Sequence, residues 1–161
     1  MNPEILNYLA GIFDGEGTVS VQVFKDNRHR YGIRIKPYIQ FAISKDDADV
    51  IDLFKKYIPV KWVVGFYKSR NIIHIRIEDL DGIRKFIEVL SPYIRLPSTK
   101  KKVEIMSKIL QKMNKHRKPY SKEEFLELLM LAKELRMLQK RRNFKKITNI
   151  DEIISKIKEE G

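Results

Sequence analysis

Two acids lie close together near the start of the chain, within the segment LAGIFDGEG at residues 9–17. Asp14 is suited to capping neighbouring backbone groups, whereas Glu16 follows a predicted helix end and offers the oxygen ligand that Mg²⁺ prefers. Ala10 and Gly11, with Gly15 four residues beyond Gly11, leave a strip of helix with almost no side chain, so a second helix could approach closely. Two such helices packed about a two-fold axis would bring two Glu16 carboxylates together with water and phosphate oxygens. The residues alone leave an alternative, in which this helix fits its own sheet and Glu16 is a solvated turn acid.

The composition restricts the kind of site that these acids can form. The chain has no cysteine, which excludes disulfides, cysteine-ligated zinc and a thiol nucleophile, and its three histidines are too scattered for a histidine-based metal motif. Any metal ion must therefore be bound by oxygen. No apolar run approaches the roughly 20 residues of a membrane span, and a secretory signal pattern is missing. We therefore expect an intracellular protein of the cytoplasm, nucleoid or an organelle, not secreted and with no membrane partner.

Positive charge indicates the partner. Thirty-three Lys and Arg stand against 21 Asp and Glu, which gives a formal net charge of +12 and a pI near 9.8. This excess is typical of nucleic-acid-binding proteins, because Lys and Arg neutralise phosphates. Charge alone also fits a basic protein that is merely soluble or that touches anionic membranes.

Hydrophobic periodicity predicts the elements that must position these residues. A helix over residues 3–13 begins at the N-cap Asn2. The next predicted elements are strands 18–24 and 33–43, a helix 47–58 capped by Ser44 or Asp46, strands 61–68 and 71–78, and a helix 79–90, followed by helices 98–115, 122–142 and 151–158. Ser121 and Glu124 form a capping-box pattern. No linker divides the chain, so one domain over residues 1–161 is expected, an α+β fold with helices on one face of an antiparallel sheet.

Alternation within the strands predicts their two faces. The second strand should bury Ile33, Ile35, Pro37, Ile39, Phe41 and Ile43. Pro37 also indicates an edge or a bulge, because proline cannot donate a ladder hydrogen bond. In the third strand, Trp62, Val64 and Phe66 are predicted to point inward.

The nine residues at 9–17 closely resemble the signature of the LAGLIDADG homing endonucleases, with Phe13 and Glu16 as variants. The element order is also similar to that family's α-β-β-α-β-β-α core, so the resemblance covers roughly residues 3–115 and leaves a helical C-terminal extension at about 116–161. It implies a saddle-shaped sheet for DNA. The signature occurs once, which in this family implies a homodimer formed through the first helix and a near-palindromic site. The residues expected in the dimer contact are Leu9, Ala10, Gly11, Phe13, Asp14 and Gly15.

The resemblance also implies an activity: metal-dependent, site-specific hydrolysis of both strands of double-stranded DNA, leaving short 3′ overhangs. In such proteins the last acid of the signature binds the metal ion, often with the preceding carbonyl. This carries over to Glu16 and Gly15, with Mg²⁺ or another divalent cation such as Mn²⁺ as cofactor.

Two lysines are expected to complete the active site by the same resemblance. Lys45, just after the second strand, corresponds to a polar or basic residue near the metal. A family lysine is expected where this chain has Pro97, and Lys100 is taken as its substitute, with Arg95 and Lys101 as alternatives. Lys100 and Lys101 also fit a simpler role as phosphate anchors at a helix N-terminus.

The polar sheet face, the turns and the basic runs of the tail are expected to contact DNA, because Arg forks onto guanine, Gln onto adenine and Lys onto phosphate. These residues are Ser20, Gln22, Lys25, Arg28, Arg30, Arg34, Lys36, Tyr38, Gln40, Lys68, Arg70, His74, Arg76, Lys101, Lys102, Arg117, Lys118, Arg141 and Arg142. The alternative is a solvated sheet face without a ligand.

Three functions fit these observations. The first is the endonuclease, which the acid at Glu16 favours because a carboxylate facing phosphate would repel DNA without a metal ion. The second is a non-cleaving DNA-binding regulator or an RNA-splicing maturase on the same scaffold. The third is a basic protein of an RNA scaffold, which would be monomeric and independent of metal.

Overall fold

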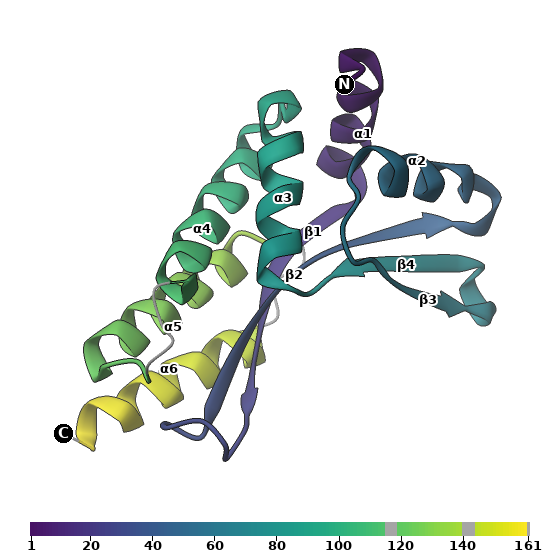
Figure 1. Cartoon of the computed structure of the whole chain (residues 1–161). Coiled ribbons are helices and arrows are strands. Elements are labelled where there is room, and N and C mark those ends of the chain that lie inside the picture. Colours follow the sequence, from purple (N-terminus) through teal and green to yellow (C-terminus); the bar gives the residue numbers. More distant parts are fainter. Residues whose placement is uncertain (115–118, 140–143, 161) are drawn as a thin grey trace. The chain divides into compact units, whose positions relative to one another are not determined.

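A computed structural model of the chain describes residues 1–114, 119–139 and 144–160 (Figure 1). In chain order, with η marking a 3₁₀ helix, its elements are α1 (Pro3–Glu16), β1 (Gly17–Lys25), β2 (Ile33–Ser44), η1 (Lys45–Asp47), α2 (Asp49–Tyr57), β3 (Val63–Tyr67), η2 (Lys68–Arg70), β4 (Ile72–Ile77), α3 (Leu80–Leu90), η3 (Ser91–Tyr93), α4 (Pro97–Asn114), α5 (Lys122–Met137) and α6 (Phe144–Glu159). The α+β class and the α-β-β-α-β-β-α order are confirmed. Among the described helices, none combines the length and the apolar character that a membrane span needs.

The helix starts follow most of the predicted caps. The Asn2 side chain accepts a hydrogen bond from the Glu4 N–H at 3.0 Å. The capping box of α5 is complete, because Ser121 Oγ accepts from the Glu124 N–H and Glu124 Oε2 accepts from the Ser121 N–H. The start of α2 is different: Ser44 caps η1 instead, and α2 begins without a side-chain cap.

Two helices are longer than their patterns predict. The first continues to Glu16, past the predicted end at Phe13, because its buried apolar side outweighs the low helix propensity of the two exposed glycines. The last begins at Phe144 rather than at Asp151, and Ile150 is buried like the later members of the same apolar stripe. The burial of Ile150 therefore extends the packed stripe of the last helix one residue before its predicted start.

The described chain forms two compact units. Unit 1 comprises Met1–Val19 and Tyr38–Val103, and it contains α1, α2, β3, β4 and α3. Unit 2 comprises Ser20–Pro37 and Glu104–Gly161, which are the far parts of the first two strands with their turn, most of α4, and the helices α5 and α6. The single domain with a core at about 3–115 stays a prediction.

Aromatic rings fill the core of unit 1. The ring of Phe41 on β2 lies 5.5 Å from Phe13 of α1, 4.5 Å from Phe54 of α2 and 5.8 Å from Phe86 of α3, measured between centroids. All four are at most 1% exposed, and their tilted and edge-on arrangements are favourable for aromatic pairs. Helices α1, α2 and α3 accordingly lie on the same side of the strands (Figure 1). The predicted buried face of β2 is confirmed, because every second residue from Ile33 to Ile43 is buried.

The four strands are ordered β1-β2-β4-β3. The antiparallel ladder of β2 with β4 runs from the pair Ile39 and Ile77 to the pair Ser44 and Ile72. Pro37 therefore lies in an interior strand rather than on an edge strand. It precedes this ladder, however, so its missing N–H costs no hydrogen bond to β4.

The outer strand β3 is exposed on both faces. Its register pairs Val64 with Ile75 and Phe66 with Ile73, so both side chains share the apolar face, as predicted. Their burial is nevertheless a wrong prediction, since Val64 is 51% and Phe66 46% exposed. Only Trp62, ahead of the strand, reaches the aromatic core, and its indole N–H donates to the Ile58 carbonyl at 3.1 Å.

Unit 2 anchors the turn between β1 and β2 to the C-terminal helices. The ring of Tyr31 stacks on Phe125 of α5 with centroids 4.9 Å apart. Arg136, also on α5, donates from Nη2 to the carbonyl of Val21 at 3.2 Å. Helix α5, which follows the predicted core, therefore supports β1 and the turn after it.

Candidate active site and nucleic-acid interface

Glu16 ends α1 with an exposed side chain. The carbonyl end of a helix carries partial negative charge and disfavours a carboxylate, so stability does not explain an acid there, whereas a bound cation would. The next residue must be glycine, because a Cβ at Gly17 would lie 2.1 Å from a ring carbon of Phe13. The sequence predicts Glu16 just beyond the helix, whereas in the structure it is the last residue of the helix. Its side chain is exposed, as predicted.

The outer side of α1 has an open strip. A Cβ at Gly11 or Gly15 would meet nothing within 4 Å, and both residues are exposed. By contrast, Leu9, Ala10 and Phe13 are at most 1% exposed within this one chain. Of the predicted dimer contact, these three are therefore corrected to core residues, because they point to the chain's own sheet, while the two glycines stay available to a second helix.

Asp14 connects α1 to the start of α4 within unit 1. Its Oδ2 accepts the backbone N–H groups of Arg95 at 3.0 Å and of Leu96 at 3.2 Å. The predicted capping role is thus present, but its partners are 81 and 82 residues away rather than local. Asp14 therefore fixes the loop before Pro97, and its contact with a second copy stays a prediction. Its Oδ1 is buried without a hydrogen-bond partner among the described residues.

The two predicted active-site lysines are both exposed. Lys45 lies in η1, and its ammonium stands 5.3 Å from the ring centroid of Phe66. Lys100 lies near the start of α4, which begins at Pro97. Within the described part of the chain, neither lysine forms a hydrogen bond or ion pair with Glu16. Their catalytic assignment stays a prediction.

The donors at Glu16 suit a hard divalent cation, since a carboxylate and a backbone carbonyl are both oxygen ligands. Over the described residues, no group of three or more His, Asp or Glu is placed to hold a metal ion. The Glu16 carboxylate and the Gly15 carbonyl therefore stay predicted ligands, and the described residues gather no cluster of acids or histidines beside them.

A polar cluster covers the other face of the sheet in unit 1. Gln40 Oε1 accepts from Arg76 Nε at 2.9 Å and Nη2 at 2.5 Å, and Gln40 Nε2 lies 3.0 Å from His74 Nδ1. The guanidinium of Arg76 stands 4.2 Å over the Tyr38 ring, a cation–π contact. The ring of Tyr67 meets His74 edge-on at 4.7 Å. The structure thus brings together four predicted DNA-binding residues, and adds Tyr67.

In unit 2, the turn between β1 and β2 is basic but partly neutralised. Asp26 accepts from Arg28 Nε at 2.9 Å and Nη2 at 2.8 Å, and its Oδ2 lies 4.0 Å from Arg34. The Arg28 hydrogen bond holds the pKa of Asp26 well below its usual range. Arg30 donates to the carbonyl of Tyr120 at 3.1 Å. All three arginines are exposed, yet Arg28 and Arg30 already donate hydrogen bonds within the chain.

The other predicted contacts fall into three groups. Those exposed as predicted are Gln22, Lys25, Lys68, Arg70 and Lys101, and Lys36 is half-buried. Ser20 and Lys102 are only 6% and 8% exposed, which argues against direct DNA contact, because their positions turn them into the packed interior. Arg117, Lys118, Arg141 and Arg142 lie outside the described residues.

Three residues were missed by sequence reasoning. Asp26 lies two positions before Arg28, a spacing that signals a local ion pair within the basic turn. Tyr67 shares the polar face, which the β3 register reveals but the blurred alternation of that strand does not. Glu78 lies 3.4 Å from Arg76 Nη1 and follows β4 directly.

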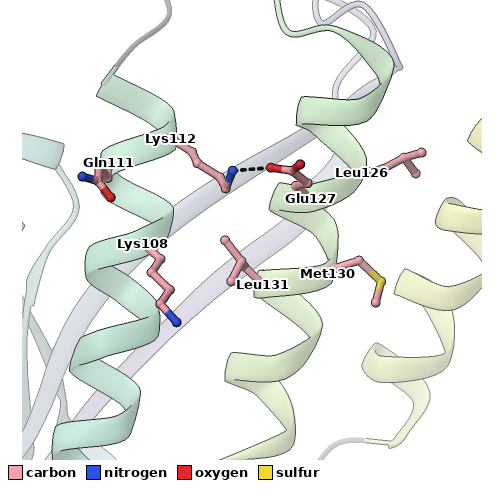
Figure 2. A pocket seen from close by; sticks show the side chains of 7 residues that line it. All are labelled: Lys108, Gln111, Lys112, Leu126, Glu127, Met130 and Leu131. Carbon is pink, nitrogen blue, oxygen red and sulfur yellow. Dashed lines mark hydrogen bonds and ion pairs between the residues drawn. The ribbon is translucent and has the colours of Figure 1, made fainter.

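A shallow hollow in unit 2 lies between α4 and α5 (Figure 2). It encloses about 470 Å³ and is lined by Lys108, Gln111, Lys112, Leu126, Glu127, Met130 and Leu131. Figure 2 shows the Lys112 ammonium directed at the Glu127 carboxylate, with which it pairs. Its one acid is thus engaged by a lysine, and the hollow is lined by residues of α4 and α5 alone, none of them a predicted site residue, so it is not the candidate active site.

Comparison with known proteins agrees with this geometry. A family model described as LAGLIDADG endonuclease matches residues 9–110, which is more than half of the chain. The structure is similar to that of the homing endonuclease I-TnaI, with a TM-score of 0.77 and 20% identity over 96% of this chain and 98% of that chain. It is equally similar to I-CvuI in complex with the I-CreI target in the presence of Mg, with the DNA not cleaved: TM-score 0.77, 15% identity, 96% of this chain and 95% of that chain.

A curated relative extends the comparison to sequence. The probable intron-encoded endonuclease 3 of Neurospora crassa is 23% identical over 84 residues, which are 52% of this chain. The chain spans only 16% of the length of that relative.

Proposed function

Since the chain belongs to the LAGLIDADG endonuclease family, we propose that it is a site-specific endonuclease that hydrolyses both strands of DNA. The observation that carries this proposal is Glu16, an exposed carboxylate at the unfavourable end of a helix, beside the open strip of Gly11 and Gly15. A protein that only binds DNA gains nothing from an acid held where it would repel phosphate. A DNA substrate also implies an intracellular site of action.

Glu16 and the carbonyl of Gly15 would hold a divalent cation, Mg²⁺ or Mn²⁺. When bound, such a cation lowers the pKa of a coordinated water and neutralises charge on the scissile phosphate. Because the described residues of one chain hold no group of three or more acids and histidines placed for a metal ion, we infer that the remaining ligands come from a second copy, from water and from the phosphate itself. Lys45 and Lys100 are the candidates to neutralise additional phosphate charge.

The second copy would pack on the open side of α1. Gly11 and Gly15 are one helical turn apart, and side-chain-free positions at this spacing let two helices approach to near backbone contact. Such a homodimer brings two Glu16 residues to one axis and makes the target near-palindromic. Because the two acids would lie close together at this axis, the two DNA strands would be cut across a narrow groove. Such cuts would leave short 3′ overhangs.

The sheet would supply specificity. Strand β2 has 12 residues, and at about 3.3 Å per residue it spans roughly 40 Å, comparable to one turn of B-DNA, about 10 base pairs. Two sheets would therefore cover a site of about 20 base pairs. The exposed Arg, Lys and Gln side chains of the polar face are the groups that read base edges and phosphates.

The test is cleavage of a randomised, near-palindromic DNA library with Mg²⁺, Mn²⁺ or EDTA, using the wild type and the variant Glu16→Gln. Bound and cut fractions are sequenced separately, and the cut ends are mapped. We expect specific, metal-dependent cutting by the wild type only, with the same bound sequences for both proteins. The variant Glu4→Gln, another exposed acid of α1, is the matched control and should cut normally.

Other outcomes assign the competing functions. Enrichment of one DNA sequence without cutting by the wild type would make the protein a DNA-binding regulator. If no DNA sequence is enriched, the functions that act on RNA become the better assignment. Full cleavage by Glu16→Gln would remove Glu16 from the active site.

A further inference from the structure

Hydrogen-bond chemistry fixes the orientation of Gln40. An arginine side chain has only donors, so the two short contacts from Arg76 identify the atom that they meet as the amide oxygen. The amide nitrogen then faces His74 Nδ1 at 3.0 Å and donates to it. A ring nitrogen that accepts a hydrogen bond carries no proton, so the proton of His74 lies on Nε2.

The surroundings of His74 keep it in this neutral form. Burial lowers the pKa of His74, and the charges of Arg76 on its own strand and Arg70 on η2 lower it further. The other groups that face it, Gln40 from β2 and the Tyr67 ring from β3, bring no negative charge.

Arg76 is held on three sides. Its Nε and Nη2 donate to Gln40, its Nη1 donates to Glu78 at 3.4 Å, and its plane lies over Tyr38. These contacts use three of its five N–H groups, and two remain for a ligand.

We propose that Gln40 is not a reader of adenine but a positioning residue, which holds Arg76 and His74 as hydrogen-bond donors that together read guanine in the DNA site. This inference rests on the proposed function for its DNA part. Guanine is the base that offers two acceptors, O6 and N7, on its major-groove edge, and a guanidinium with two N–H groups to spare matches them. Gln40 opposes Arg76 directly in the β2–β4 register and reaches His74 diagonally past the small Ala42.

The first experiment needs no DNA. Two-dimensional ¹H–¹⁵N spectra of the imidazoles report the tautomer of His74 in the wild type, in Gln40→Met and in Gln40→Glu, with Gln22→Met on β1 as the matched control. We expect the Nε2–H form in the wild type and in the control, and loss of this single form in Gln40→Met. Gln40→Glu should shift the proton to Nδ1, because a carboxylate can only accept. An unchanged tautomer in both Gln40 variants would overturn the positioning role.

The second experiment measures base preference in the DNA that each variant binds. Arg76→Ala and His74→Ala each define the positions that these residues read, and a good bidentate contact corresponds to roughly 5- to 150-fold discrimination. Gln40→Met should weaken the guanine preference by about 2- to 10-fold at those same positions. Gln40→Glu should retain the preference at the Arg76 position, since its carboxylate still accepts from the guanidinium.

Together, the two experiments distinguish a failure of the positioning role of Gln40 from a failure of the proposed function. A change at a position that neither Arg76→Ala nor His74→Ala affects would make Gln40 a direct reader and overturn the inference. If the wild type enriches no DNA sequence, the proposed function fails and guanine reading fails with it, whereas the spectra still decide whether Gln40 positions its two neighbours.

Discussion

Asp14 and Glu16 are two residues apart on one helix, but the structure gives them opposite energetic roles. Replacing Asp14 by Ala removes the acceptor of two backbone N–H groups, at Arg95 and Leu96. Loss of a capping carboxylate costs about 1–2 kcal/mol, and charge-assisted bonds belong at the upper end of that range. Removal of the buried, unpartnered Oδ1 returns up to ~1 kcal/mol. We therefore expect Asp14→Ala to lower the free energy of unfolding by about 1–2 kcal/mol.

Glu16→Gln should behave in the opposite way. The side chain is exposed, and neutralising a carboxylate at the carbonyl end of a helix is favourable by about 0.3 kcal/mol or slightly more. Glu4 in the first turn of the same helix provides the matched control, because there the dipole favours the acid and Glu4→Gln should cost a similar small amount.

Urea unfolding followed by circular dichroism would measure all three variants, with the slope of the transition checked for constancy. For a chain of this length, the loss in Asp14→Ala corresponds to a melting temperature lower by about 2–8 °C. The reasoning would be refuted if Asp14→Ala unfolded at the wild-type midpoint, or if Glu16→Gln lost as much stability as Asp14→Ala.

Three further predictions follow from the same geometry. Gly11→Leu, placed where a side chain meets nothing in its own chain, should leave the far-UV spectrum unchanged but abolish dimerisation in sedimentation equilibrium, and an unaltered dimer would contradict the proposed contact. Because the folded-state pKa of His74 is lowered, the unfolded chain binds more protons just below pH 6.5, so stability should fall as the pH drops through this window. Denaturation between pH 5 and 7.5 should show a shallower slope in His74→Gln, and identical slopes would exclude this effect. Phe86→Ala should cost about 3–5 kcal/mol by opening the aromatic core, and a loss below about 1 kcal/mol would show that the core repacks.

Local pattern was enough where one strand or helix decides its own environment. The alternation of β2 predicted six buried positions, and all six are buried, because a slip of one residue would expose the whole apolar set. The capping box at Ser121 was likewise predictable, since both of its hydrogen bonds join residues within one helical turn.

The sequence pattern did not predict burial or contacts that depend on segments far away in the chain. Val64 and Phe66 have the correct facing but no helix above them, and nothing in their own strand reports how far the helical layer extends. The partners of Asp14 lie on a distant loop, so its spacing within α1 indicated a cap without identifying what it caps. The same holds for Gln40, whose type suggested an adenine reader until the register placed it opposite Arg76.

The candidate site shows why the signature segment resists interpretation residue by residue. Its apolar members, Leu9, Ala10 and Phe13, are occupied in holding α1 to its own sheet, and Asp14 in holding the loop before α4. The exposed side of the helix carries Gly11 and Gly15 in its C-terminal half, and the helix ends at the exposed Glu16. Two exposed glycines give their own chain no side-chain packing energy, and an acid at the carbonyl end of the helix gives it no electrostatic benefit. In the proposed function, both features become favourable together when a second helix covers the glycines and a cation lies between the acids, so we infer that assembly and catalysis would depend on the same surface.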